Sequence, residues 1–78
     1  MSRSPITEDD LGTLCAALMS GGTTAVVAYS YRAHATVVHD EPTTTISSII
    51  DGLGLPFESI NEPGPNRSGR IVVWSDGR

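Results

Sequence analysis

The segment from Thr23 to Asp40 constrains the fold of this chain more than any other part. It is rich in valine, threonine, alanine and tyrosine, and its β-branched and aromatic members suit a pleated, half-buried surface. Segments with helical patterns precede and follow it. We therefore predict two antiparallel strands that turn near residues 31–34 and form the centre of a small sheet.

Valine falls on both faces of these predicted strands. Val26 and Val27 point to opposite sides of the first strand, as Val37 and Val38 do on the second. A sheet with one face in water should instead alternate apolar and polar residues. We therefore expect both faces to be at least partly covered, although the two predicted helices can supply only one of the two covers.

The first predicted helix begins after Thr7, which can cap it, with Asp10 in the place of the usual capping-box glutamate. Gly21 and Gly22 can end it. Its predicted core-facing stripe consists of Leu11, Leu14, Cys15, Leu18 and Met19.

A second helix is predicted after Pro42, capped by one of the threonines at positions 43–45 and ended by Gly54 and Pro56. Its apolar stripe consists of Ile46, Ile49, Ile50 and Leu53.

Two further strands are predicted over residues 57–61 and 70–75, the latter apolar on both sides and hence central. Residues 1–5 are predicted to be a flexible tail, and the proline- and glycine-rich segment 62–69 a mobile loop. The chain of 78 residues then reads as a single α+β domain in the order α-β-β-α-β-β. We expect a four-stranded antiparallel sheet with both helices on one face.

Most chemistries lack their residues in this sequence. A glycine-rich phosphate loop and a nucleophile elbow are both missing, and the single cysteine, Cys15, cannot form an internal disulfide or a zinc pair. His34 and His39 are five residues apart on one strand, so they project to opposite faces. A weak ligand cluster remains at 39–41. We predict a protein that is not an enzyme and uses no metal or cofactor.

The chain has no apolar run long enough to cross a bilayer and no apolar leader, so we expect a cytoplasmic protein without membrane contact. Its net charge of -4 disfavours nonspecific binding to nucleic acid. All five basic side chains are arginine, a bias typical of a high-GC bacterium or its phage.

The predicted element order, together with the small-residue helix segment 15–22, resembles the half-domain of LAGLIDADG homing endonucleases. In that family such a helix pairs two half-domains, and an acidic residue at its end holds the catalytic metal. The corresponding positions, Ser20 to Gly22, carry no acidic residue, so the resemblance does not imply cleavage. It implies the fold and, as an alternative function, a nucleic-acid-binding module.

The function that we expect from the sequence is protein binding, either as a homodimer or by docking on a host or partner protein. A chain this short has a thin core, and a second molecule could supply the missing cover of the sheet. The candidate interface residues are Ala16, Ala17, Tyr29, Tyr31 and Trp74.

Two alternatives remain open. One is nucleic-acid binding through Arg32, Arg67 and Arg70, with Tyr31 available for stacking. The other is inhibition by acidic mimicry, in which the carboxylates of segments 8–10 and 40–41 would form one patch.

Overall fold

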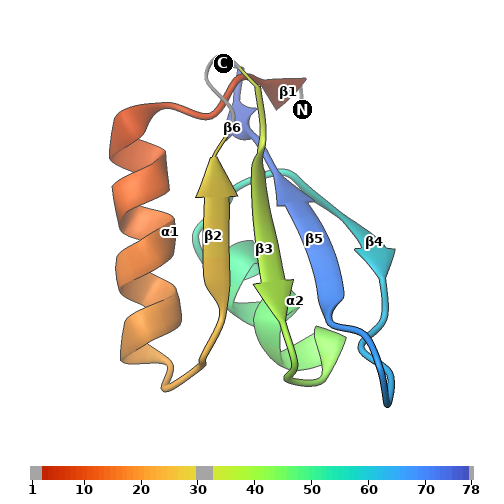
Figure 1. The fold of residues 1–78 in the computed structure, drawn as a ribbon. Helices are drawn as coiled ribbons and strands as arrows, with labels where there is room; N and C mark the ends of the chain where they lie inside the picture. The colour runs from red at the N-terminus through yellow and green to blue at the C-terminus, as the bar shows by residue number, and fades with distance from the viewer. Residues whose placement is uncertain (1–2, 30–32, 78) are drawn as a thin grey trace.

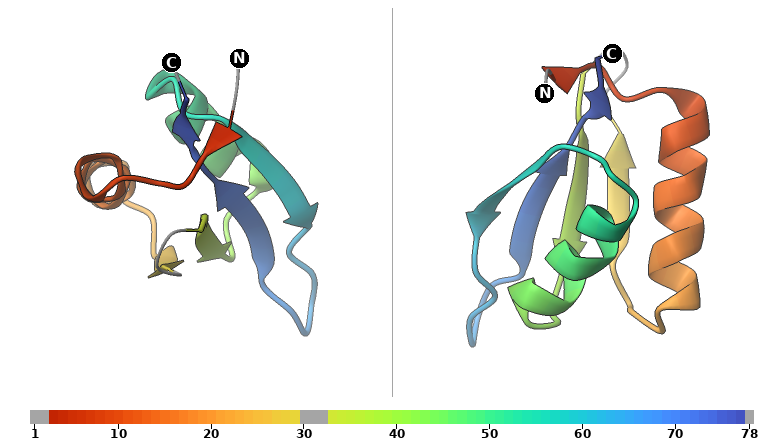
Figure 2. Two further views of the ribbon diagram at one scale, coloured as in Figure 1. Left: turned by 90° about the horizontal axis from the view of Figure 1, so that it is seen from above. Right: turned by 180° about the vertical axis from the view of Figure 1, so that it is seen from behind.

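Four strands form the main sheet of the computed structural model, which describes residues 3–29 and 33–77. The sheet is antiparallel, with the strand order β2-β3-β5-β4. Both helices, α1 and α2, lie on one face of it (Figures 1 and 2). This arrangement confirms the predicted α+β class. The elements are α1 (Glu8–Ser20), β2 (Val26–Tyr29), β3 (Ala35–His39), α2 (Thr43–Gly52), β4 (Phe57–Asn61) and β5 (Gly69–Val73).

Helix α1 begins and ends where the sequence predicts. The Asp10 backbone N–H donates to Thr7 Oγ1 at 3.1 Å, which satisfies one of the free donors of the first turn. Past the helix end, Gly22 has a φ of 73°, a left-handed conformation that favours glycine. Leu14 and Leu18 are buried, but Met19 is 79% exposed. The prediction that Met19 faces the core was wrong, because only the centre of the apolar stripe contacts the sheet and α2.

Helix α2 differs from its prediction at the N-terminus. Pro42 is its N-cap, and no side chain makes a capping hydrogen bond. The Thr43 hydroxyl instead donates to Glu62 Oε2 at 2.6 Å, which ties the helix start to the chain after β4. The predicted threonine cap is therefore wrong, whereas Ile46 and Ile50 are buried as expected.

Strands β3 and β5 form the centre of the sheet. Ala35 and Val37 of β3 face the helices and are fully buried, as are Ile71 and Val73 of β5. Val37 pairs with Val27 on one side and with Ile71 on the other, so these residues form one row beneath the helices. The prediction of a central strand near the C-terminus is confirmed.

The segment before α1 is built into the fold. Strand β1 (Arg3–Ser4) pairs with β6 (Ser75–Asp76), so the two ends of the described chain lie side by side (Figure 1). Ile6 is buried, and its N–H donates to the Ala33 carbonyl at 2.9 Å. Residues 3–5 of the predicted tail therefore belong to a strand and the ordered connection that follows it.

Ser75 joins this terminal pair to α1. The Thr7 N–H donates to Ser75 Oγ at 2.9 Å, and Ser75 Oγ donates to Asp10 Oδ2 at 2.6 Å. The beginning of α1 is thus held by a residue near the other end of the chain.

The predicted loop 62–69 contains a defined turn. The Gly64 N–H donates to the Arg67 carbonyl at 2.9 Å, and Ser68 Oγ donates to Asp40 Oδ1 at the same distance. The segment therefore folds back toward the end of β3 after leaving β4.

Candidate interaction surface

One face of the sheet carries no helix. Its side chains alternate with the buried row, because neighbouring residues of a strand point to opposite faces. The strand register places two rows of side chains on this face. One row is Val26, Val38, Arg70 and Asn61, and the other is Ala28, Thr36, Val72 and Glu58.

The β5–β4 half of this face is charged and is partly covered by the chain itself. The guanidinium of Arg3 lies 4.2 Å from the centre of the Trp74 ring, and its Nη1 is 3.7 Å from Glu58 Oε2. On another side of Trp74 lies the His34 ring, 5.8 Å away between centroids. Strand β1 thus brings a cation onto the indole and leaves Trp74 half-buried.

The β2–β3 half of the face is uncharged and uncovered. We name it the β2–β3 face and define it by Val26, Ala28, Thr36 and Val38. Val26 is 65% exposed, and the other three are exposed or half-buried. Among residues 3–29 and 33–77, no segment lies over β2 and β3 on this side of the sheet (Figure 2).

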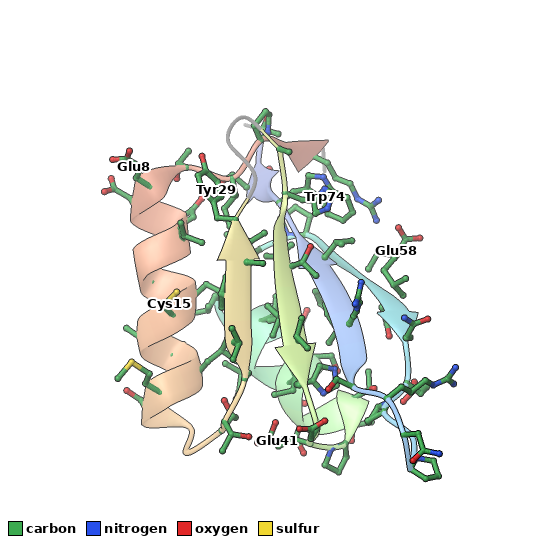
Figure 3. All side chains as sticks on the ribbon, viewed as in Figure 1. Glu8, Cys15, Tyr29, Glu41, Glu58 and Trp74 are labelled. Carbon is green, nitrogen blue, oxygen red and sulfur yellow. The ribbon has the colours of Figure 1, made fainter. Side chains whose placement is uncertain are left out.

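The predicted interface residues do not form one surface. Ala16 is exposed on α1 and Ala17 is half-buried. Tyr29 pairs with Ala35 and so points to the helix side, whereas Trp74 lies against Arg3 on the other side. In Figure 3 Tyr29 lies on β2, whereas Trp74 lies between the end of β5 and the start of β6. Tyr31 falls outside the described residues.

The predicted nucleic-acid residues that the structure describes both lie in the β4–β5 hairpin. Arg67 is exposed in the turn beyond β4, and Arg70 is exposed on the uncovered face of β5. Arg32 falls outside the described residues. Arg67 and Arg70 are two basic side chains in a chain of net charge -4, and nucleic-acid binding through them stays a prediction.

The two acidic segments lie at opposite ends of the molecule. Figure 3 shows Glu8 at the start of α1 and Glu41 at the far end of the sheet. Glu41 Oε2 accepts hydrogen bonds from the Thr24 N–H at 2.9 Å and from the Thr24 hydroxyl at 3.2 Å. The bond from the Thr24 backbone is the main reason that the pKa of Glu41 lies below its ordinary value. The carboxylates do not form the single patch that mimicry requires.

His39 is a structural residue at the end of β3. Its side chain is 2% exposed, and Nδ1 lies 2.9 Å from the Glu41 carbonyl oxygen, to which it donates. The ring packs so closely on Gly69 that a Cβ there would lie 2.7 Å from Nε2. Within the described residues, no three His, Cys, Asp or Glu side chains are grouped closely enough to hold a metal ion.

A hollow of about 380 Å³ lies between β1, the end of α2 and the start of β4. Arg3 and Asp51 supply its charges, and among the residues that the structure describes no nucleophile with a neighbouring base lines it. Its other walls are formed by Gly54, Leu55, Pro56 and Phe57. Neither α1 nor α2 is long and apolar enough to cross a membrane.

Comparison with known protein families, curated proteins and solved structures finds no match. The resemblance to LAGLIDADG half-domains therefore stays a prediction. Sequence reasoning named the aromatic residues but missed Val26 and Val38, although valine on both strand faces was the signal that could have found them.

Proposed function

We propose that this protein binds another protein through the β2–β3 face and catalyses no reaction. The observation that supports this most directly is the 65% exposure of Val26 on a face that neither helix covers. Ala28 and Val38 lie beside it and add further apolar surface without a charge. A contiguous exposed apolar area is typical of a contact surface.

The uneven cover of the sheet supports the same proposal. On the other half of this face, Arg3 shields Trp74 and pairs with Glu58. A chain that only needed to be soluble would gain from similar polar side chains over β2. The β2–β3 face instead exposes aliphatic side chains to water, unless a partner covers them.

A second copy of the chain is the first partner to test. Sedimentation velocity over a wide concentration range should show association of the wild-type protein. V26K should remain folded, because Val26 is exposed, and should sediment as a monomer. N61K is the matched control, since Asn61 lies on the same face at the opposite edge. Equal association of wild type and V26K would show that a different surface is used.

A further inference from the structure

The two edges of the sheet are protected to different degrees. Strand β4 carries Glu58, and its register shifts between Ser59 and Asn61, so that Ile60 forms a bulge. Charges and bulges are the devices by which edge strands avoid pairing with other chains. Strand β2 has the sequence Val-Val-Ala-Tyr, without a charge or a proline, and it pairs with β3 in unbroken register.

Helix α1 lies beyond β2 rather than over the middle of the sheet. In Figure 1, α1 lies to the side of the free edge of β2. The view from above in Figure 2 shows that α1 lies behind the place that a strand added to this edge would occupy. A strand added to β2 would therefore have one face against α1. We name this position the β2 edge and define it by β2 together with Gly12, Cys15 and Met19 of α1.

Those three α1 residues lie on the side of the helix turned away from α2. The opposite side of α1 faces α2, because a Cβ on Gly21 would contact Ile49 of α2. Gly12, Cys15 and Met19 share one stripe by helical spacing. Cys15 is half-buried, Met19 is largely exposed, and a Cβ on Gly12 would meet nothing within 4 Å. This stripe offers small and flexible apolar groups that a neighbouring strand could cover.

Within residues 3–29 and 33–77, the charges around the β2 edge lie at its two ends. From Leu11 to Tyr29 the chain contains no charged side chain. Glu8 lies at one end of this region, and Glu41, bonded to Thr24 just before β2, lies at the other (Figure 3). A complementary segment would be uncharged along β2 and basic at both ends.

A second copy fits this position poorly. Pairing two β2 strands about a two-fold axis would bring both α1 helices over the same seam, because each helix projects beyond its own β2 edge (Figure 2). A single extended segment has no helix to place there. This difference favours a segment from another protein.

We infer that the β2 edge binds an extended, uncharged segment of a partner protein, flanked by lysine or arginine, as a fifth strand of the sheet. Backbone hydrogen bonds to β2 would supply most of the affinity, and the α1 stripe would select small or apolar side chains. The inference rests on the proposed protein binding and adds the kind of partner.

A peptide titration followed by NMR of the amides tests it. The probe is a synthetic peptide of alternating threonine and valine with a lysine at each end. We expect shift changes in β2 and along Gly12, Cys15 and Met19, with little change in β4. The same peptide with glutamate at both ends should bind about tenfold more weakly, which corresponds to about 1.4 kcal/mol. A version N-methylated on alternate residues should not bind, because it lacks the backbone donors.

Two α1 variants test whether the peptide contacts the Gly12–Cys15–Met19 stripe or another side of the helix. M19K should weaken binding of the lysine-flanked peptide severalfold, because it replaces an apolar contact by a repelling charge. S20K is the control, since Ser20 is also exposed but lies outside the Gly12–Cys15–Met19 stripe. Equal binding by both variants, or by the N-methylated peptide, would overturn the inference.

The outcome also distinguishes the inference from the proposed function. No peptide binding, combined with association of the wild type that V26K abolishes, would keep the β2–β3 face as the contact surface and reject the fifth strand. Failure of both peptide binding and self-association would reject the inference and would reject a second copy as the partner of the β2–β3 face. A dimer paired through β2 would show that the second copy occupies the edge, and would overturn the inference.

Discussion

Strands β5 and β2 both flank β3, and both are rich in valine, yet they have opposite environments. In β5, Ile71 and Val73 are buried under the helices, and Val72 is buried on the other face as well. In β2, Val27 packs against the core while Val26 is exposed. The difference arises from the strand order, because β5 has β3 and β4 as neighbours and β2 has only β3. Apolar character alone therefore does not tell whether a strand is core or contact surface.

The largest difference in stability between the two strands is expected for a pair of truncations to alanine. I71A should lower the free energy of unfolding by about 2–5 kcal/mol, because it leaves a cavity in a close-packed core. V26A should change it by no more than about 0.5 kcal/mol, since the side chain is mostly in water. Urea denaturation measures both. A loss for V26A close to that for I71A would mean that the β2–β3 face is already covered in solution.

Two glycine substitutions, one in β5 and one on α1 beside the β2 edge, extend the comparison by adding a methyl group. G69A should lower stability by about 1–3 kcal/mol, because its Cβ would lie within 3 Å of the His39 ring and of Pro63. G12A should raise stability by about 0.5–1 kcal/mol, because the site is open and alanine favours a helix. Thermal unfolding of both variants checks the signs. A destabilised G12A would show that the side of α1 facing the β2 edge is already occupied.

Removing the cover of Trp74 should make the two halves of the face that carries no helix more alike. R3A deletes the cation over the indole and the partner of Glu58, and should lower stability by about 0.5–1 kcal/mol. Trp74 fluorescence should shift to longer wavelength as the ring becomes more exposed. The control is R67A, whose guanidinium lies in the distant turn. An unchanged emission maximum in R3A would contradict the stacking.

The smallest expected effect concerns Glu41, which holds Thr24 before the start of β2. Its folded-state pKa lies below the ordinary value of 4.5, so its contribution to stability is full above that value and is lost as the pH falls through the lower folded-state pKa. E41Q should therefore be less stable than wild type near neutral pH, and the difference should vanish in acid. Denaturation at a series of pH values measures this. A constant difference would exclude the charge as its source.

Local signals were sufficient to predict the fold class. Thr7, whose hydroxyl can cap the helix before an apolar repeat, and Gly54, with a φ of 74°, mark helix ends through their own chemistry. The central position of β5 followed from apolar residues on both of its faces. These features depend on a few neighbouring residues, and the sequence displays them directly.

Contacts between distant segments could not be read in the same way. The pairing of Arg3 with Asp76 involves strands of two residues, which are too short to show a periodic pattern. The exposure of Met19 depends on where α1 stands relative to β2, a tertiary property. For the candidate surface, valine on both strand faces predicted an incomplete cover, but only the strand order shows that the gap lies over β2.

The pairing of β1 with β6 has a practical consequence for engineering. Because the two ends of the described chain meet in one short ladder, a brief linker could join them and the chain could be reopened in the turn from Gly64 to Arg67. Such a circular permutant would keep the neighbours of β3 and β5 in space while changing their order of synthesis. Its new ends would emerge beside β4, leaving the opposite flank of the molecule clear for attachment studies.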